Sequence, residues 1–409
     1  MDNIEYVKKV VDKQNKWRSE CINLIASENV MSKKADSVLC SDFKHRYAEG
    51  LPYKRYYQGT KYIDDLESKV NEEAKSLFEC KQADVRSISG VVANDAVLCK
   101  LIDPTKKIMV YQTKAGGHIS HNIMGSVGKY TKNIIFFPLT KDKYHIDIER
   151  TIALIEKEKP NVLLFGKSLF LFPDPVREIR EAFPNITIVY DAAHVLGLIA
   201  GKQFQQPLQD GADYMTGSTH KTFFGPQRGI ILSNKTSKEW NNIEYGVFPG
   251  STSNHHLYTL PPLLIAFYEI EKFGETYAKQ VIQNARILAK ALYNKGFDVQ
   301  APEFNFTESH TIAVDVSRYG GGSYVAELLE KNNIILNKNL LPIDEDSDPK
   351  NPKGIRIGTQ EMTRVGMKEE QMEDIAELIK KAVNGMNVKN HVKSFRKKYQ
   401  KVKYSFDNY

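Results

Sequence analysis

The sequence has 409 residues, of which 41% are hydrophobic and 26% charged, and its formal net charge is +7 at pH 7. This length exceeds what one hydrophobic core usually holds, so we expect a globular protein of two domains. No apolar run is long enough to span a bilayer as a helix, and the acidic start, Met1–Glu5, is unlike a signal peptide. We therefore expect a soluble, cytoplasmic protein.

Residues 1–45 are expected to form a helical N-terminal arm, and residues 46–285 a large α/β domain in which short β-rich runs alternate with helical runs. The β-rich runs are Lys107–Tyr111, Asn133–Phe136, Asn161–Phe165, Ile186–Tyr190, Tyr214–Thr216 and Gly229–Leu232. Their apolar character is continuous rather than alternating, which indicates burial on both faces. A mainly parallel sheet covered by helices follows from this pattern.

Residues 286–409 are expected to form a smaller α+β C-terminal domain with a basic tail. A long helical stretch, Pro262–Leu292, leads into it. Strand-like runs at Thr311–Val316 and Ile355–Gly358 flank a predicted helix near Ser323–Asn332. The polar run Asp344–Lys353 is broken by prolines and predicts a surface loop.

The excess positive charge lies in this tail. Residues 386–409 hold seven Lys or Arg and one acidic residue, Asp407, so they carry +6 of the total +7. Four aromatic residues are interleaved with the charges: Phe395, Tyr399, Tyr404 and Phe406. Such a tail could contact phosphates or bases, but aromatics at helical spacing more often pack on their own domain, and we favour packing.

Cysteine usage does not indicate a metal or redox site. The cysteines are Cys21, Cys40, Cys80 and Cys99. They lie 19, 40 and 19 residues apart, without the close pairs of metal or redox motifs. We expect free thiols and no metal.

Asp191, at the end of a buried strand, and Lys221, in a later polar loop, form the most informative pair. Pyridoxal phosphate needs a lysine for its imine and an acid that keeps the ring nitrogen protonated. Opposite charges about 4 Å apart interact by roughly 4 kcal/mol at a protein-like dielectric, enough for that task. Taken alone, each residue is more often a helix cap or a solvated lysine. Neighbouring polar side chains favour the cofactor site, namely His194, Ser218, Thr219, His220 and Thr222.

A candidate phosphate site lies at the start of the helical run that ends near Ile102. Ser89, Gly90 and Val91 would present backbone amides there, and the helix dipole favours an anion. Taken alone, Ser-Gly before a helix is most often only a cap. Beside Asp191 and Lys221 it predicts the phosphate end of the cofactor.

Further motifs are distributed over nearly the whole chain. They are Leu24–Asn29, Arg46–Gly50, Lys54–Tyr57, Gly116–His118, Asp191–Gly197, Ser218–Thr222, Val247–Gly250, Asn337–Asn339 and Gly354–Thr359. Together they resemble the serine (glycine) hydroxymethyltransferase family. The resemblance implies a pyridoxal-phosphate-dependent transferase of the aspartate-aminotransferase fold, with a mainly parallel, seven-stranded sheet in the large domain.

The resemblance also implies roles around the cofactor. Lys221 resembles the imine lysine, Asp191 the partner of the ring nitrogen, and His118 the imidazole stacked on the ring. His194 and Ser168 resemble residues near the ring hydroxyl, and His220 one that orients the substrate. Tyr47 and Gly250 match positions that reach the phosphate of a neighbouring subunit, which implies a homodimer with interfacial active sites.

For the substrates, Arg356 resembles the arginine that binds the amino-acid carboxylate, a task suited to its planar fork. Ser27 and Tyr57 look like supporting contacts, and Glu49 matches the catalytic glutamate that handles the proton of the substrate hydroxyl or the pterin. Pterin-contacting positions are matched by Thr113, Gly117, Ile119 and Asn339. The implied reaction moves the hydroxymethyl carbon of serine reversibly to a reduced pterin and leaves glycine.

Several stretches are similar to archaeal members rather than to the commoner bacterial pattern. They are Gly90–Asn94, Asn254–His256, Asn337–Pro342 and Gly358–Glu361. After Gly250, Ser251–His256 stands where the bacterial pattern has a glycine-rich run. The archaeal likeness implies tetrahydromethanopterin as carbon carrier, with tetrahydrofolate as the other choice.

Two other functions remain open. A threonine-aldolase-like enzyme would share Lys221, Asp191 and Arg356 and cleave β-hydroxy amino acids without a pterin, but Glu49 and Asn339 favour pterin use. A non-catalytic member that binds RNA through the tail is disfavoured because the site residues are intact.

Overall fold

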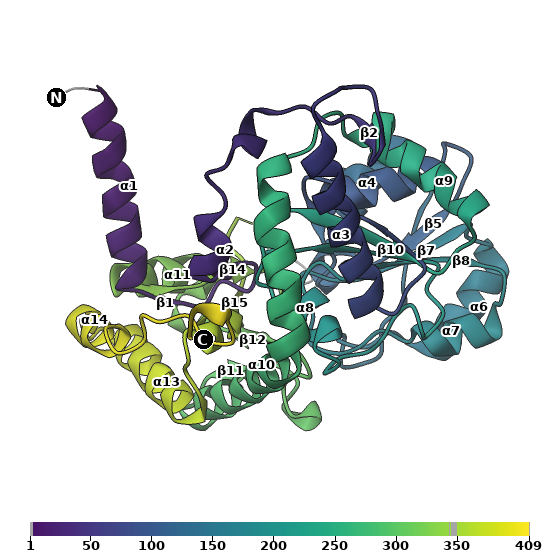
Figure 1. Ribbon diagram of the computed structural model, residues 1–409. Coiled ribbons are helices and arrows are strands. Elements are labelled where there is room, and N and C mark those ends of the chain that lie inside the picture. The colour runs from purple at the N-terminus through teal and green to yellow at the C-terminus, as the bar shows by residue number, and fades with distance from the viewer. Residues whose placement is uncertain (1–2, 343, 345–349, 409) are drawn as a thin grey trace. The chain divides into compact units, whose positions relative to one another are not determined.

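The computed structural model describes residues 3–342, 344 and 350–408, which form two compact units (Figure 1). The sheet unit comprises Ser27–Lys279 and Tyr404–Tyr409, and the terminal unit comprises Met1–Ala26 and Gln280–Lys403. The division into an arm and two domains at residues 45 and 285 stays a prediction. Of the expected surface loop at 344–353, residues 345–349 lie outside the described residues, and Asp344 is buried.

A seven-stranded sheet forms the centre of the sheet unit. Its strands are β4 (Gln82–Asp84), β5 (Ile108–Val110), β6 (Ile134–Phe136), β7 (Val162–Phe165), β8 (Thr187–Asp191), β9 (Tyr214–Ser218) and β10 (Gly229–Ser233). The order is β4-β10-β9-β8-β7-β5-β6. The five strands from β9 to β6 pair in parallel, whereas β10 is antiparallel to both β9 and β4. The predicted mainly parallel α/β sheet is confirmed.

Burial on both faces explains why the apolar runs are continuous. In β7, Val162 and Leu164 belong to the core cluster built around α4 (Gly90–Leu101), while Leu163 between them points to the opposite face and is equally buried. On that opposite face, Gly217 of β9 lies against Leu196 of α8 (Leu196–Ala200). The edge strand β4 was not among the predicted strands because its sequence, Gln-Ala-Asp, is mostly polar.

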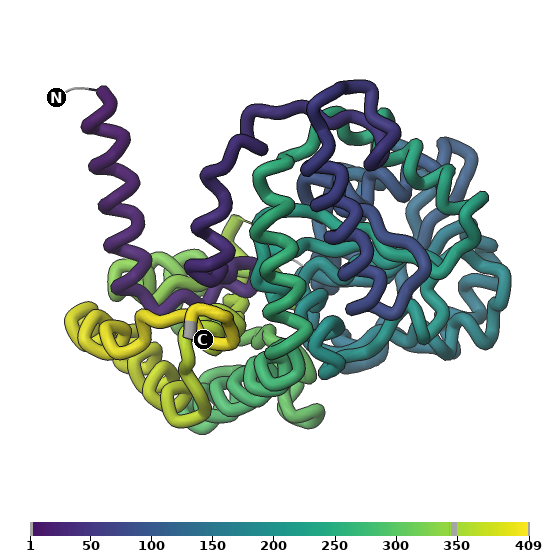
Figure 2. The backbone as a smooth tube through the Cα atoms, in the orientation of Figure 1, coloured from purple at the N-terminus to yellow at the C-terminus, as the bar shows by residue number. Residues whose placement is uncertain are grey.

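Some helices of the sheet unit start at a side-chain cap, whereas α3 (Lys61–Leu77) and α7 (Val176–Ala182) start without one. Asp147 accepts a hydrogen bond from the Arg150 amide at the start of α6, and Thr236 and Glu239 form a capping box on α9. Helix α3 and the first half of α10 lie side by side (Figure 2) and line a common cavity. Besides α4 and α8, the helices are α2 (Lys33–Ser37), α3 (Lys61–Leu77), α5 (Ser126–Tyr130), α6 (Ile148–Glu158), α7 (Val176–Ala182), α9 (Ser237–Tyr245) and α10 (Leu260–Asn294), whose residues from Gln280 on belong to the terminal unit. A short hairpin pairs β2 (Gly50–Leu51) with β3 (Lys54–Arg55).

The terminal unit contains a four-stranded antiparallel sheet in the order β11-β12-β15-β14. Its strands are β11 (Asp298–Val299), β12 (Thr311–Asp315), β14 (Asn337–Asn339) and β15 (Gly354–Gly358). The N-terminal segment joins this unit because β1 (Ile22–Asn23) pairs in parallel with β13 (Ile334–Ile335). The helices are α1 (Asn3–Ser19), α11 (Gly321–Lys331), α12 (Gln360–Arg364), α13 (Glu369–Val383) and α14 (Lys389–Arg396).

The tail packs, as predicted, but not all of it on the terminal unit, because Tyr404 and the residues after it belong to the sheet unit. In the terminal unit, buried Arg396 donates to the Cys21 carbonyl at 2.8 Å. In the sheet unit, the Tyr404 ring lies 5.5 Å from that of Tyr277, and the Phe406 ring 5.6 Å from that of Phe273. Within the described ranges, every helix is too short or too polar to cross a membrane.

Candidate active site

The carboxyl ends of β8 and β9 border one pocket in the sheet unit, where ligands of open parallel sheets bind. Asp191 is the last residue of β8, Ser218 the last of β9, and Lys221 follows in the next turn. The pocket is lined by Gly90, Val91, His118, Lys167, Asp191, Ala193, His194, Ser218 and Lys221. The sequence analysis singles out most of these residues, and Lys167 and Ala193 are the additions.

Asp191 is buried and held by several donors. The Asn94 amide donates to its Oδ2 at 2.7 Å, His121 Nε2 lies 2.9 Å from the same oxygen, and the Ala193 amide donates to Oδ1 at 2.9 Å. Thr216 in turn donates to Asn94 Oδ1, which fixes the orientation of that amide. Burial favours the neutral acid, but the bonds from His121 and Asn94 outweigh it and hold the pKa of Asp191 well below its usual range. Asp191 is therefore an anion at neutral pH.

Sequence reasoning missed His121 as a member of this site. It lies three residues after His118, and the two rings are 5.9 Å apart. A second histidine so close to a motif histidine was the available signal, yet a buried histidine is more often a structural residue. Here it orients and stabilises the carboxylate.

Side-chain hydrogen bonds tie the Lys221 turn to two other segments. The Asn29 amide donates to the Lys221 carbonyl at 2.7 Å and contacts the Tyr277 hydroxyl at 2.9 Å. Thr222 donates to the His194 carbonyl at 2.7 Å, which ties this turn to the loop after β8. Burial, together with the charge of Lys221, lowers the pKa of His220 to about 4, so its imidazole is neutral at pH 7.

The start of α4 presents an anion site to the same pocket. Ser89 is the N-cap and accepts from the Val92 amide at 3.3 Å. A Cβ on Gly90 would come within 2.3 Å of Ser218 Oγ, so any larger residue would require that hydroxyl to rotate away. Val91 is 39% exposed, and the open first turn leaves amides and the positive end of the helix dipole for a phosphate.

Two other cofactor candidates lie on loops beside the pocket. The Ser120 amide donates to His118 Nδ1 at 3.2 Å, which fixes the ring and places its proton on Nε2. Ser168 donates to the Gly116 carbonyl through its amide at 2.7 Å and its hydroxyl at 3.1 Å. The bond joins the loop after β7 to the loop that carries His118.

These residues fit pyridoxal phosphate. An anionic carboxylate, a lysine and the open start of a helix share one pocket, and Gly90 at that helix start packs closely against Ser218 Oγ. A half-buried imidazole from the loop after β5 completes the set.

Glu49, Tyr47 and Tyr57 form a second group in the sheet unit, with Ser253, which we call the Glu49 cluster. Ser253 donates to Glu49 Oε1 and lies 3.3 Å from the Tyr47 hydroxyl. The rings of Tyr47 and Tyr57 are 4.9 Å apart, and the charge of Glu49 raises the pKa of Tyr57. None of these four is among the described residues that line the Lys221 pocket. Tyr47 is 46% exposed and Tyr57 43% exposed.

The remaining candidates of the sheet unit lie on loops. Thr113 accepts from the Asn122 amide at 3.1 Å, and Ile119 is 54% exposed. A Cβ on Gly117 would lie 2.6 Å from the Tyr111 carbonyl oxygen, so glycine is required by a close backbone approach. Gly250 is exposed in the helical turn Gly246–Ser251, and Ser27 is half-buried.

Arg356 and Asn339 belong to the terminal unit. Arg356 lies on β15, is 8% exposed and donates to Asn337 Oδ1 at 3.1 Å. Burial lowers its pKa to about 10, so the guanidinium remains charged at neutral pH. Asn339 ends β14, and its amide donates to the Leu340 carbonyl at 2.6 Å.

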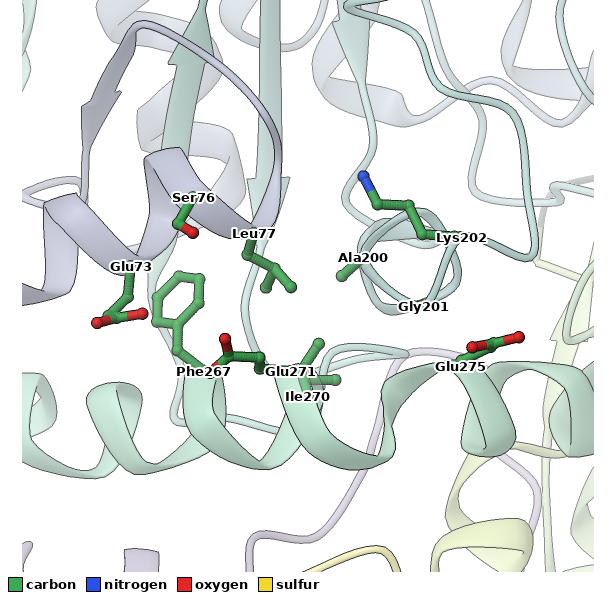
Figure 3. Close-up of a pocket in the computed structure, with 10 residues that line it drawn as sticks. All are labelled: Glu73, Ser76, Leu77, Ala200, Gly201, Lys202, Phe267, Ile270, Glu271 and Glu275. Carbon is green, nitrogen blue, oxygen red and sulfur yellow. The ribbon is translucent and has the colours of Figure 1, made fainter.

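A larger cavity of about 260 Å³ lies elsewhere in the sheet unit, between α3, the turn after α8 and α10 (Figure 3). It gathers Glu73, Glu271, Glu275 and Lys202, but Glu73 pairs with Lys69 at 2.8 Å and Lys202 with Glu79 at 2.8 Å. In the part of the chain that the structure describes, no cluster of three or more histidine, cysteine or acidic side chains is arranged to hold a metal ion. We interpret this cavity as a solvated surface feature.

Comparisons with known proteins agree with this geometry. A family model described as serine hydroxymethyltransferase matches residues 2–379. Serine hydroxymethyltransferases of Thermoplasma acidophilum and Methanocaldococcus jannaschii are each 48% identical, over 99% and 98% of this chain and 96% of each relative. The enzyme of Methanobrevibacter smithii is 49% identical over 97% of this chain and 94% of its own. The crystal structure of L-threonine transaldolase from Pseudomonas fluorescens, in its internal aldimine state, is similar with a TM-score of 0.90 and 27% identity, covering 99% of this chain and 94% of that one.

Proposed function

The chain belongs to the serine hydroxymethyltransferase family, as its archaeal-type motifs predicted, and we propose that it transfers the hydroxymethyl carbon of serine reversibly to a reduced pterin. The products would be glycine and the methylene-pterin. The observation that carries the proposal is the shared pocket of Asp191 and Lys221 at the carboxyl ends of the parallel strands. The likeness of the chain to archaeal relatives favours tetrahydromethanopterin over tetrahydrofolate as carrier.

Pyridoxal phosphate bound in this pocket would supply an electron sink for the electrons of the broken Cα–Cβ bond. Lys221 would bind its aldehyde carbon, and the Asp191 anion would hold the proton on its ring nitrogen. Ser89, Gly90 and Val91 would bind its phosphate through amides, and His118 would set the tilt of its ring.

Other residues would act on the substrates. Glu49 would take the proton of the serine hydroxyl, and Tyr57 would support the substrate carboxylate. Arg356 would bind that carboxylate through its two parallel N–H donors. Thr113, Gly117, Ile119 and Asn339 are the proposed pterin contacts, and neutral His220 would orient the substrate without adding a charge.

We further propose that the active enzyme is a homodimer in which Tyr47, Glu49 and Gly250 serve the partner's pocket. The support is that Tyr47, Tyr57 and Ser253 are exposed, that Glu49 is half-buried, and that none of the four is among the described residues that line the Lys221 pocket of their own chain. A monodisperse monomer should be nearly inactive in serine cleavage. Sedimentation combined with a turnover assay tests this, and full activity in the monomer would remove the proposal.

The function is tested by absorption spectra of the purified holoenzyme with glycine and tetrahydromethanopterin, tetrahydrofolate or neither. We expect a long-wavelength cofactor band that rises strongly with one pterin, which would identify the carrier. A glycine spectrum that responds to neither, together with cleavage of β-hydroxy amino acids, would favour a threonine-aldolase-like activity instead. Cofactor affinity, measured by fluorescence titration of the apoenzyme, should fall in Asp191→Asn whatever the substrate.

The role of Glu49 has its own test. Glu49→Gln should bind cofactor and glycine as the wild type does, yet lose pterin-dependent cleavage of serine. Unchanged pterin-dependent turnover in this variant would refute the assignment.

A further inference from the structure

Glu49 lies in a short segment whose backbone is held from two sides. Asn254 accepts from the Ala48 amide at 3.0 Å and donates to the Arg46 carbonyl at 3.0 Å. On the other side, Arg55 Nη1 donates to the carbonyls of Ala48 at 2.8 Å and Gly50 at 2.7 Å. The backbone on both sides of Glu49 is therefore fixed by side chains.

Both sets of contacts lead to one buried carboxylate, that of Glu67, although Arg55 Nε also donates to Asp64 Oδ1 at 2.7 Å. Its Oε2 lies 2.7 Å from Arg55 Nη2 and 3.1 Å from His255 Nε2, and the side chains of all three residues are at most 2% exposed. Arg228 donates to His255 Nδ1 at 2.6 Å, so the proton of this imidazole is on Nε2 and points to Glu67. Glu67 thus joins the hairpin that carries Arg55 to the loop that carries His255.

Ser253 and Asn254 precede His255 in that loop and are thereby fixed relative to Glu49. Ser253 donates its hydroxyl proton to Glu49 Oε1 and contacts the Tyr47 hydroxyl. A hydrogen bond from such a donor restricts the orientation of a carboxylate at the end of a flexible side chain. Ser253 is exposed and Glu49 is only half-buried, so without this hydrogen bond the Glu49 side chain could sample several rotamers.

We propose that Ser253 and Asn254 are positioning residues for Glu49, held in place by the buried Arg228–His255–Glu67 chain. Ser253 sets the direction of the carboxylate, and Asn254 sets the backbone that carries it. This inference rests on the proposed function, because it assigns Glu49 to proton transfer in serine cleavage.

The test compares purified holoenzymes with Ser253→Ala, Ser253→Thr and a control in the same loop, Ser251→Ala, whose hydroxyl donates to the Val247 carbonyl instead. Ser253→Ala should lower kcat for pterin-dependent serine cleavage about 10-fold, the effect of losing one hydrogen bond to a charged group. KM for serine and the cofactor spectrum with glycine should stay unchanged. Ser253→Thr, which keeps the hydroxyl, should restore most of the rate, and Ser251→Ala should match the wild type.

A kcat for Ser253→Ala within two-fold of wild type would overturn the proposal, as would an equal loss in all three variants. If the wild-type enzyme cleaves serine with neither pterin, the proposed function is wrong, but the positioning role of Ser253 can still be tested. Crystal structures of the wild type and of Ser253→Ala test it, because the Glu49 carboxylate must change its position in the variant. An unmoved carboxylate would overturn the proposal.

Discussion

Replacing Glu67 by glutamine should destabilise the sheet unit strongly. The change removes a buried negative charge that interacts with His255 and with the guanidinium groups of Arg55 and Arg86. Burial opposes ionisation of this carboxyl group, but His255 and the guanidinium groups of Arg55 and Arg86 outweigh it and lower the pKa of Glu67 to about 2 from 4.5. At about 1.4 kcal/mol per pH unit, this difference amounts to about 3 kcal/mol at neutral pH. Breaking a buried ion pair from one side costs about 3–5 kcal/mol in general, which agrees.

The sign of the pH dependence follows from the lowered pKa. The stabilisation is complete above the unfolded value of 4.5 and is lost as pH falls through the folded value near 2. The difference between wild type and Glu67→Gln should therefore shrink from about 3 kcal/mol at pH 7 to about 1.5 kcal/mol at pH 3.

Urea unfolding of the holoenzyme followed by circular dichroism, at fixed cofactor concentration, measures this difference. Glu72→Gln on the same helix is the matched control, because its side chain is 61% exposed and its ion pair with Lys69 is 3.7 Å long. The control should lose less than about 1 kcal/mol. A loss below about 1 kcal/mol for Glu67→Gln at pH 7, or a loss that does not depend on pH, would refute the reasoning.

Three other substitutions test the remaining features. Lys221→Ala should abolish turnover and give bound cofactor the spectrum of free pyridoxal phosphate, while circular dichroism stays unchanged; residual turnover would exclude the assigned lysine. Asp191→Asn should lower kcat by about 10³-fold, because it removes an interaction of about 4 kcal/mol with the protonated ring nitrogen. A decrease of kcat under 10-fold at saturating cofactor would contradict this. Asp407→Ala should lower the melting temperature by about 2–4 °C, because Asp407 accepts from the Lys33 and Lys34 amides at 2.7 and 3.0 Å as a cap of α2. An unchanged melting curve would show that the C-terminal segment does not hold α2.

The fold and the centre of the pocket could be predicted from the sequence for a physical reason. Strands buried on both faces need continuous apolar runs, and ligands of parallel sheets bind where those runs end, so the apolar run before Asp191 was enough to place this residue at the pocket. The edge strand β4 has no such run and was missed. The assigned roles of Glu49, Tyr57 and Arg356 remain predictions.

Partners of buried charges were beyond sequence reasoning. Glu67 and His255 are 188 residues apart along the chain, Arg228 and His255 are 27 apart, and no local pattern links them. His121 was missed for a related reason, since its importance comes only from the 2.9 Å approach to Asp191. Long-range polar contacts of this kind are set by the tertiary fold, whereas periodicity reports only on neighbours along the chain.

Two buried carboxylates of the sheet unit are each stabilised as anions by a histidine and a second donor. This arrangement limits which groups can give the enzyme its pH dependence. Asp191 is held by His121 and Asn94, Glu67 by His255 and Arg55, and the pKa of each carboxyl group is lowered. The pKa of His220 is also lowered, to about 4. All three groups therefore keep one charge state between about pH 5 and 8. A change of activity between pH 5 and 8 must therefore come from the titration of another group or of the substrates. If the wild-type rate changes with pH in this range and the rate of His220→Gln does not, this account would be contradicted.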